Sequence, residues 1–471
     1  MMCVDVSEGQ WSKLFTKKII QGEIIFDFSM PMFDIRNKEI KAGALNDILW
    51  MTTEHPASLG EQQYQEVFVM FAKNVFRAIP PSPNPVGEEF DPEDDEPLYD
   101  PSWPHTHLIY EILIRLVESH HFNTNIAKKF IDQLFVYRLL VLFDVEDPRE
   151  RDMVKTAVHR VYGKFLNLRA FIRKAMKHVF YEFVYEDERH NIAEMLEILG
   201  SVVNGFAVPL RDEHKVFLER TLIPLHKNRF LPLYYSQLSL CVIQYAEKDS
   251  SLVPTIILGL LRLWPKTNTT KELMFLNEIE EILDVTPAEH FAAFLQPLMQ
   301  QLARSIASQH FQVAERALSY WNNEYLVSIV SDHLDEILPI VLPTMLRYSR
   351  AHWNKNVQLQ VLNSLRLFMD LSPKLYESIA RTCETQESDP AGRSGSLENS
   401  NRKWAIIEEI ARKNLASSSA TLSTLTISPS AESGSRRHSD RRKHSPTQES
   451  SAGPTSMANM TSHDDRPKSP S

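Results

Sequence analysis

Side chains that could bind a ligand are concentrated in two stretches of the sequence. One of them is HRVYGKFLNLRAFIRK, residues 159–174. If this stretch forms one helix, a rotation of about 100° per residue places His159, Tyr162 and Arg169 within an arc of roughly 80°. An imidazole, a phenol and a guanidinium would then form one stripe. Such a stripe offers hydrogen-bond donors to a carboxylate or a phosphate.

A second stretch, IAEMLEILGSVVNGFAVPLRDEH at residues 192–214, adds apolar side chains. Ile198 and Val202 lie at positions i and i+4 and therefore share a helix face. Arg211 and His214 follow just past that predicted helix. Together the two stretches predict an apolar floor rimmed by cations, which suits a short peptide with apolar anchors and a carboxylate or phosphate. The alternative is a buried helix pair whose tyrosine and arginine satisfy each other, and spacing alone favours this alternative.

The sequence contains no arrangement that predicts catalysis. Histidines and carboxylates occur near one another without a metal-binding spacing such as HExxH, as in His120, His121 and Asp132 or in Glu188, His190 and Glu194. There is no G-x-S-x-G turn and no glycine-rich phosphate loop. Two-metal hydrolytic chemistry would need several Asp and His ligands on loops at strand ends. We therefore expect no catalytic residue, no metal and no cofactor.

Composition predicts a large helical protein. The chain has 471 residues, of which 43% are hydrophobic, and only 13 glycines, which disfavours a sheet with many tight turns. The three cysteines, Cys3, Cys241 and Cys383, form neither a disulfide framework nor a zinc-binding spacing. No run of about 18 uncharged apolar residues exists, so we expect no membrane span. The N-terminus has no signal-peptide pattern.

Charge is distributed unevenly along the chain. The net charge is −10, but residues 401–471 contain 11 basic and 7 acidic side chains, a net charge of +4. The preceding 400 residues contain 40 basic and 54 acidic side chains, a net charge of −14. An acidic folded region argues against nucleic-acid binding as the main task.

The elements that position these residues are predicted to be helices. Apolar residues recur at helical spacing from Trp11 onward, except among the prolines between Pro80 and Pro104. Similar proline-containing segments recur later, with Pro224, Pro297 and Pro339 at corresponding places. Their separations of 73 and 42 residues are roughly two periods and one period of a helix-pair repeat of about 40 residues. Stacked units of this kind form a solenoid with a concave surface.

The interruption in the helical pattern is strongly acidic. Its segment EEFDPEDDEPLYD, residues 88–100, has eight carboxylates in thirteen residues and no cation. The many prolines around it exclude a continuous helix. Two interpretations stay open, namely a solvated acidic turn and a segment that docks onto a basic surface.

Two tryptophans are each followed by asparagine, in Trp321–Asn322 and Trp353–Asn354. Armadillo-repeat import receptors use Trp and Asn one helical turn apart, repeated along a peptide-binding groove. Here the two residues are adjacent and the pairs are few. We therefore expect core tryptophans with an asparagine at a helix junction.

From residue 386 on, Ser, Thr, Pro, Arg and Asn dominate, which predicts a disordered tail. The exception is RKWAIIEEIARKNL at 402–415, a candidate amphipathic helix. A basic run, RRHSDRRKHSP at 436–446, is consistent with a nuclear-localisation signal or with a solubilising segment. The candidate phosphorylation sites are Ser428, Ser439, Ser445 and Ser469.

Several long runs resemble the B-prime regulatory subunits of protein phosphatase 2A, the class of about fifty-six kilodaltons. Besides residues 159–174, the runs are AIPPSPNPVGEEFDPEDDEP (78–97), FDVEDPRERD (143–152), RLWPKTNTTKELMFLNEIEEILD (262–284) and HFQVAERALSYWNNEY (310–325). The resemblance covers about residues 8–385 and resumes weakly at 402–411. It implies HEAT-like helical repeats and a three-part complex with a long scaffold subunit and a catalytic subunit.

The resemblance also implies a substrate groove. Members of this family recognise the short motif Leu-x-x-Ile-x-Glu, often strengthened by phosphorylation or acidic residues. The matching positions are His159, Arg160, Tyr162, Lys164, Arg169, Glu197, Ile198, Val202, Arg211 and His214. In the family the acidic loop faces the assembled enzyme, and its positions here are Glu93, Asp94, Asp95, Glu96, Pro97 and Trp103.

Three features depart from the usual family pattern. Val202 stands in place of Ile, and Arg211 stands in place of Lys, and both changes are conservative. A glycine that usually precedes Ile192 is missing, so Asn191 runs straight into it. A deletion inside a helix would rotate the following residues by about 100°, whereas at a helix start it only shortens the loop. We expect a helix to begin at this place.

These observations predict an all-α, HEAT-like solenoid at residues 11–385, after a disordered lead (1–10) and before a disordered tail (386–471). We expect a noncatalytic regulatory subunit that directs a serine/threonine phosphatase to substrate proteins carrying short acidic-hydrophobic motifs. The alternative is a helical-repeat scaffold or transport adaptor unrelated to phosphatase. We expect a cytoplasmic location, with an additional nuclear one if the basic run of the tail is a working signal.

Overall fold

The computed structural model describes residues 8–79, 98–186, 192–388 and 408. By its internal contacts the chain divides into two compact units, Met1–Asp389 and Pro390–Ser471, and the helices described here belong to the first.

The ends of the helical region differ slightly from the expected boundaries. The first helix begins at Glu8, inside the range expected to be a disordered lead, and the last helix ends at Ser388, three residues beyond the expected end. Except for one residue, the predicted tail helix at 402–415 lies outside the described residues, and so do the serines considered for phosphorylation.

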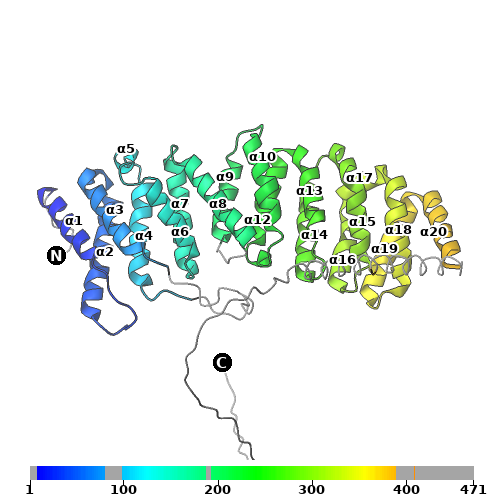
Figure 1. Ribbon diagram of the computed structural model, residues 1–471, viewed down its shortest axis with the longest axis horizontal. Helices are drawn as coiled ribbons and strands as arrows, with labels where there is room; N and C mark the ends of the chain where they lie inside the picture. The colour runs from blue at the N-terminus through cyan, green and yellow to red at the C-terminus, as the bar shows by residue number, and fades with distance from the viewer. Residues whose placement is uncertain (1–7, 80–97, 187–191, 389–407, 409–471) are drawn as a thin grey trace, which may run out of the picture. The chain divides into compact units, whose positions relative to one another are not determined.

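The described residues form helices joined by turns, 3-10 segments and a π-helical segment at Leu218–Leu222, and no strand occurs among them (Figure 1). The α-helices of the N-terminal part are α1 (Glu8–Gly22), α2 (Ile35–Glu54), α3 (Glu61–Val75), α4 (Trp103–Glu118), α5 (Thr124–Ala127), α6 (Gln133–Val141), α7 (Pro148–Lys164), α8 (Arg169–Glu186), α9 (Ala193–Asn204) and α10 (Asp212–Phe217). Those of the C-terminal part are α11 (Ile223–Leu225), α12 (Tyr235–Lys248), α13 (Val253–Arg262), α14 (Thr269–Asp284), α15 (Leu295–Ile306), α16 (Phe311–Ser319), α17 (Glu324–Asp332), α18 (Leu334–Ala351), α19 (Lys355–Leu371) and α20 (Pro373–Ser388).

The helices stack in two layers, and each helix contacts the next helix of its own layer. One layer contains α2, α4, α7, α9, α12, α14, α16 and α19, and the other contains α6, α8, α11, α13, α15, α18 and α20. Neighbouring helices from the two layers pack as pairs, such as α6 with α7 and α15 with α16. In Figure 1 the helices follow one another in chain order from α1 to α20. This arrangement is the helical-repeat solenoid that the sequence predicts.

The recurring prolines mark one of the two layers. Pro224 lies in α11, Pro297 lies near the start of α15 and Pro339 lies inside α18. Between α11 and α15 this layer also contains α13, which carries Pro254 in its first turn. The separation of 73 residues therefore spans two repeats and that of 42 residues spans one, in agreement with the spacing argument.

Asparagine side chains begin several of the helices. Asn268, Asn323 and Asn354 each accept a hydrogen bond from a backbone N–H in the first turn of α14, α17 and α19. Those N–H groups have no partner within the helix, so the caps stabilise the helix starts. In the pair Trp353–Asn354, the asparagine itself caps the following helix, as expected. After the pair Trp321–Asn322, the capping residue is the next one, Asn323.

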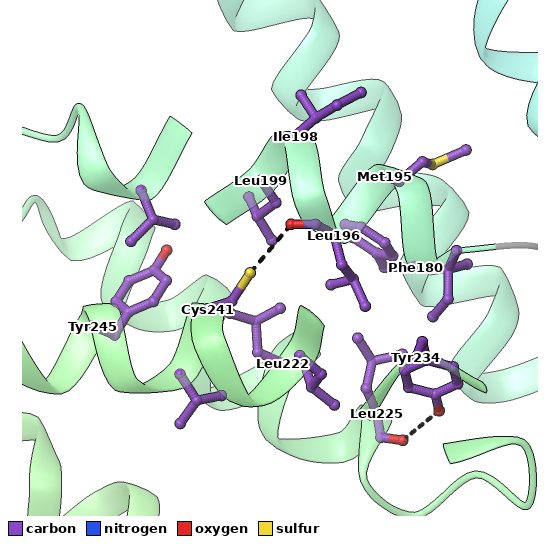
Figure 2. Packing of buried hydrophobic residues seen from close by; sticks show 14 of the residues in the cluster. Phe180, Met195, Leu196, Ile198, Leu199, Leu222, Leu225, Tyr234, Cys241 and Tyr245 are labelled. Carbon is purple, nitrogen blue, oxygen red and sulfur yellow. Dashed lines mark hydrogen bonds between the residues drawn. The ribbon is translucent and has the colours of Figure 1, made fainter. Parts of the chain in front are cut away.

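The core is continuous along the stacked helices, and Figure 2 shows the part between α9 and α12. The thiol of Cys241 donates to the backbone carbonyl of Leu196 at 3.3 Å, and the hydroxyl of Tyr234 donates to that of Leu225 at 2.8 Å. Burial raises the pKa of Cys241 to about 12, so this thiol stays protonated at neutral pH. No described helix is both long and apolar enough to cross a membrane.

One ion pair between neighbouring repeats is fully buried. Nε2 of His226, just after α11, lies 3.0 Å from an oxygen of Glu278 in α14, and both side chains are 0% exposed. Burial lowers the pKa of His226, but the charge of Glu278 and the hydrogen bond to it outweigh this effect and raise the pKa. The pair therefore ties two repeats together through charge as well as packing.

Candidate functional site

Six of the ten expected binding residues come together where α7, α8, α9 and α10 meet. The first stretch is not the single helix assumed above, because a turn separates α7 from α8. Phe165 and Leu168 point into the core at this turn, with 0% and 4% of their surface exposed, and the Leu168 N–H donates to the Phe165 carbonyl at 3.0 Å. The shared helical arc therefore holds for His159 and Tyr162, whereas Arg169 reaches the same place through the turn.

A cavity of about 420 Å³ opens between the C-terminal ends of α7 and α9, the start of α8 and the segment that leads to α10. Residues far apart in the sequence meet there because the helices of successive repeats stack side by side. The residues of the expected groove that line this cavity are His159, Tyr162, Arg169, Val202, Arg211 and His214. The structure thus brings together the imidazole, phenol and guanidinium groups that the spacing argument selected.

Tyr162 holds two arginines on one wall of the cavity. The guanidinium of Arg169 lies 5.1 Å from the centre of the Tyr162 ring, a distance typical of a cation–π contact. Its Nε donates to the Tyr162 carbonyl at 2.9 Å, and its Nη2 donates to the Gly163 carbonyl at 3.2 Å. The Tyr162 hydroxyl accepts a bond from Nη1 of Arg173 at 3.1 Å. Carbonyls at the end of α7 gain donors in this way, because they lack helical partners.

Two histidines lie at the cavity in their neutral form. The ring of His214 stacks on that of Phe206, with 3.9 Å between centres and 16° between planes. Burial lowers the pKa of His214, and Glu213 opposes this shift in part. Burial also lowers the pKa of His159, and the charge of Arg160 adds to the effect. Each imidazole therefore offers one donor and one acceptor at pH 7.

A second cavity, of about 340 Å³, adjoins the first along α8. The two cavities share Arg173, Val202, Phe206 and His214. The second adds apolar side chains from α8, α9 and α10, namely Met176, Leu199 and Phe217. A ligand can therefore place apolar side chains against this floor while its anionic group lies near the guanidinium groups.

Four residues of the expected groove lie outside both cavities. Nε of Arg160 donates to Glu118 at 2.6 Å, and Glu197 accepts a bond from Lys155 at 2.7 Å. Lys164 is exposed. Ile198 is 2% exposed and belongs to the buried cluster shown in Figure 2. The geometry adds no support to a direct ligand contact at these four positions, and their binding roles stay predictions.

The cavity also contains residues that the sequence argument did not select. These are Gly163, Arg173, Ser201, Gly205, Phe206, Ala207 and Pro209. Arg173 lies one turn after Arg169 in α8, so the i+4 spacing was a usable signal for it. Phe206 follows the end of α9, where no helical period applies, and its place depends on how the chain turns toward α10.

The absence of a glycine before Ile192 affects only the segment that precedes α9. Helix α9 begins at Ala193 and Ile192 precedes its first turn, so the deletion lies before a helix rather than inside it. Asn191 is outside the described residues. The register of Val202 relative to the start of α9 is therefore unaffected, as expected.

Positions 93–97 of the acidic segment lie outside the described residues, but its flanks are described. Trp103 begins α4, and the guanidinium of Arg149 lies 4.9 Å from its ring centre and 4.3 Å from that of Tyr99. Arg149 also donates from Nη2 to the buried carboxylate of Asp147 at 2.7 Å. Residues 98–103 are thus held against the N-terminal end of α7.

Arg77 joins the other flank to the same place. Its guanidinium donates to both oxygens of Glu150, at 2.9 and 2.7 Å, and to Asp100 at 2.9 Å. Tyr110 donates to Glu150 at 3.0 Å, and Glu150 is 0% exposed. The hydrogen bonds that Arg77 donates to Glu150 raise the pKa of Arg77, so this guanidinium stays charged. Arg77, before the acidic segment, and Asp100, after it, are therefore held together at Glu150.

Within the described ranges, no group of three or more His, Cys, Asp and Glu side chains could hold a metal ion.

The fold and the cavity together define a class of protein. It is a helical-repeat protein with a cavity whose cationic, aromatic and apolar side chains can bind a ligand. The chain matches the family described as Protein phosphatase 2A regulatory B subunit (B56 family) over residues 2–411. It belongs to this family.

Relatives from distant organisms agree with the family. The chain is 50% identical over 404 residues to the 56 kDa regulatory subunit delta isoform of serine/threonine-protein phosphatase 2A from Oryctolagus cuniculus, a match that covers 85% of this chain and 68% of that protein. It is 48% identical over 411 residues to the delta 1 isoform from Schizosaccharomyces pombe, covering 87% and 74%. It is 49% identical over 379 residues to regulatory subunit pptr-1 of Caenorhabditis elegans, covering 80% and 69%. The chain is accordingly a regulatory, noncatalytic phosphatase 2A subunit, which removes the alternative of an unrelated adaptor.

Proposed function

We propose that the cavity between α7 and α10 binds short linear motifs of the Leu-x-x-Ile-x-Glu kind in substrate proteins. The observation that carries this proposal is the juxtaposition of Arg169, Arg173 and Arg211 with the apolar floor of Val202 and Phe206 in one cavity of about 420 Å³. Apolar anchors of the ligand bury surface on the floor, and its carboxylate or phosphate accepts hydrogen bonds from the guanidinium groups.

Arg211 is the arginine best placed to receive an anionic group. Its side chain is 79% exposed, and its ion pair with Glu213 is long, at 3.7 Å. Arg169 and Arg173, in contrast, already donate to the Tyr162 backbone and hydroxyl. A ligand carboxylate at Arg211 therefore competes with little existing bonding, which favours added acidic or phosphorylated positions at this edge of the cavity.

We further propose that the chain docks onto a scaffold subunit and a catalytic subunit, and that the acidic segment takes part. Support comes from the family and from the anchoring of the segment's two flanks by Arg77 and Arg149. The carboxylates of residues 88–97 suit a basic surface on a partner.

The test of motif binding is a calorimetric titration of a Leu-x-x-Ile-x-Glu peptide into the full chain. A six-residue ligand must be ordered on binding, so we expect micromolar affinity, about −8 kcal/mol. Arg211→Glu should weaken binding by at least about 30-fold, because a lost charge partner costs about 2–5 kcal/mol and about 1.4 kcal/mol is tenfold. The matched control is Arg262→Glu, an exposed charge reversal on α13 outside both cavities.

Two further results decide the meaning of that titration. Arg211→Glu should still assemble with scaffold and catalytic subunits in a pull-down, because the cavity receives the motif rather than those chains. Peptide affinity that is equal in the wild type and in Arg211→Glu, with unchanged melting curves, would remove this cavity from motif recognition.

The cellular location is proposed from the sequence alone. We propose a cytoplasmic protein with a nuclear fraction that depends on the basic run at 436–446, which lies outside the described residues. Replacing Arg441, Arg442 and Lys443 with Ala should lower nuclear accumulation, measured by fluorescence imaging of a tagged chain. Phosphorylation nearby adds about −2 per group and should act in the same direction. Unchanged distribution of the variant would refute the signal.

A further inference from the structure

A third cavity, of about 1120 Å³, lies beside α8 on the side of α6. The two helices are neighbours in one layer (Figure 1). Helix α6 has nine residues and α8 has eighteen, so α6 is about half as long as α8 and leaves part of it uncovered. This α6–α8 cavity is larger than either cavity of the proposed motif site, which measure about 420 and 340 Å³.

The walls of the α6–α8 cavity are largely apolar and accessible. Tyr137 and Val141 of α6 are 56% and 39% exposed and line one side. Phe171 and Val179 of α8, both half-buried, line the other side. A concave surface with exposed aromatic and aliphatic groups is stabilised when a large apolar side chain displaces the water that covers it. The walls therefore suit an aromatic or long aliphatic side chain of a ligand.

The lining also contains charged groups that balance one another. Lys174 and Lys177 bring two positive charges, and Asp144 and Glu182 bring two negative ones. His178 and two neutral amides also line the cavity, and Nε2 of His178 lies 3.2 Å from an oxygen of Glu182. A balanced set of charges gives no strong preference for an anionic or a cationic ligand. The apolar walls therefore determine what the cavity itself can hold.

The α6–α8 cavity is continuous with the motif site across α8. Ala170, Lys174 and Lys177 line both this cavity and the motif cavity of about 340 Å³. They lie at i, i+4 and i+7, so they form one stripe along α8. Ala170 is exposed and small, which makes the stripe low at this residue. Lys174 is exposed, and its ammonium has no ion-pair partner among the described residues. An extended chain can thus pass over the stripe and pair an acidic side chain with a lysine.

The order of the three cavities gives the direction of the bound chain. The α6–α8 cavity shares no residue with the cavity of about 420 Å³, so the cavity of about 340 Å³ lies between them. In the proposed function, the anionic group of the ligand lies at the guanidinium groups of the 420 Å³ cavity, and the apolar anchors extend toward the 340 Å³ cavity. In Leu-x-x-Ile-x-Glu the apolar residues precede the Glu. The N-terminal flank of the motif therefore points toward α8.

We propose that the residues just before the substrate motif cross α8 and place one large apolar side chain in the α6–α8 cavity. An acidic residue on the way pairs with Lys174 or Lys177. A helix is about 10–12 Å across, so the crossing takes about three to four extended residues. The inference rests on the proposed motif site and adds a selection among substrates. Of two proteins with the same six-residue motif, the one with an aromatic residue about four positions before the Leu binds more tightly.

The test titrates a set of peptides into the full chain by calorimetry. The first is the six-residue motif alone, and the second adds Phe-Ser-Glu-Ser before its Leu. The third has Ala in place of that Phe, and the fourth has the Phe at the same distance after the motif's Glu instead. The second peptide should bind about three- to tenfold more tightly than the third, because burial of the ring outweighs the cost of ordering it. The fourth should gain nothing from its Phe.

Variants of the cavity wall locate the gain. Tyr137→Ala removes part of the α6 wall, and Ala175→Phe fills the cavity from α8. Each should reduce the gain from the N-terminal Phe to less than about twofold, since the ring loses its wall or its space. Affinity for the six-residue peptide should stay unchanged, because neither residue lines the two motif cavities. Leu134→Ala is the matched control, since Leu134 is 54% exposed on the same helix as Tyr137 but lies outside the cavity. It should keep the full gain.

The outcomes separate this inference from the motif site itself. A six-residue peptide that does not bind the wild type overturns the proposed function and the extension together. If that peptide binds but the N-terminal Phe brings no gain, or the C-terminal Phe brings it instead, the extension alone is overturned. A full gain in both Tyr137→Ala and Ala175→Phe, with melting curves that show folded proteins, overturns the assignment of the ring to the α6–α8 cavity.

Discussion

The guanidinium of Arg169 and the backbone carbonyl of Tyr162 are joined by a hydrogen bond of 2.9 Å, while the same guanidinium lies over the Tyr162 ring. Arg169 therefore closes the end of α7 and also forms part of the cavity wall. The sequence allowed two interpretations of Arg169, either as a structural partner of Tyr162 or as a contact for a ligand. At this residue the two roles are compatible. A substitution here must change stability as well as binding.

Arg169→Ala is expected to lower the free energy of unfolding by about 1–3 kcal/mol, because two carbonyls at the end of α7 lose their donor. Thermal and urea unfolding followed by circular dichroism measure this change. Lys174→Ala, an exposed substitution in the same helix, serves as the control and should stay within about 0.5 kcal/mol of the wild type. Equal stability of both variants would mean that water replaces the guanidinium without cost.

Helical spacing correctly predicted which residues share a face within a helix, but it did not predict the positions of residues beyond the helix ends. It placed His159 with Tyr162 and identified Val202, because these residues lie inside α7 and α9. It could not foresee the turn before Arg169 or the place of Phe206. Those positions depend on burial of side chains against other repeats and on the direction of a turn, and neither has a periodic signal in one sequence.

Motif binding is expected to strengthen as the pH falls from about 7.5 to 5.5. The pKa values of His159 and His214 are lowered by burial, so both rings are neutral at pH 7 and gain charge only below about 6.5. A protonated ring next to an anionic ligand adds attraction, and the ligand's Glu stays ionised down to about pH 4.3. Calorimetry across this pH range measures the effect.

The control for the pH dependence is the double variant His159→Gln and His214→Gln, whose affinity should vary little between pH 7.5 and 5.5. The same two histidines have the opposite effect on stability. Their lowered pKa values mean that the unfolded chain binds more protons, so their contribution to stability is lost as the pH falls below about 6.5. Affinity that falls on acidification, in a chain that is still folded, would contradict the proposed role of the rings.

Glu278→Gln is expected to destabilise the protein most at mildly acidic pH. The pKa of His226 is raised by Glu278, so the stabilisation is complete below the unfolded value of about 6.5 and is lost as the pH rises through the folded value. Removal of the charge leaves a buried imidazolium without its partner, which costs about 3–5 kcal/mol. Urea unfolding at pH 6 and pH 9 measures the difference, which should be smaller at pH 9. A pH-independent difference would show that the pair contributes only a neutral hydrogen bond.

Gly259→Ala is expected to lower the free energy of unfolding by about 1–3 kcal/mol, because overpacking forces neighbours to shift. A Cβ at this position in α13 would lie 2.8 Å from Cγ2 of Ile223 in α11. Gly43→Ala in α2 is the matched control, since no atom lies within 4 Å of its added Cβ and helix propensity should raise stability by about 0.5–1 kcal/mol. Chemical unfolding of both variants distinguishes the two signs.

The period of the helix pairs was indicated by the sequence because prolines recur at one place in the repeat, whereas the HEAT-like fold was inferred from the resemblance to the family. Burial of individual aromatic residues was not indicated, as the pair Trp321 and Trp353 demonstrates with 4% and 63% exposure. The two tryptophans have the same following residue and occur at similar helix junctions. What separates them is the neighbouring repeat, which covers one ring with Phe368 and leaves the other at the surface.

The stacking of each helix on its neighbours also determines how cooperatively the chain unfolds. A repeat in the interior of the stack gains interface energy on two sides, whereas a terminal repeat gains it on one, so fraying begins at the ends. Helices α7 to α10 have repeats on both sides, and α20 contacts only α18 and α19 among the described helices with substantial contacts. Amide hydrogens of α9 should consequently exchange with solvent much more slowly than those of α20, and the motif cavity should persist while the C-terminal repeats open and close.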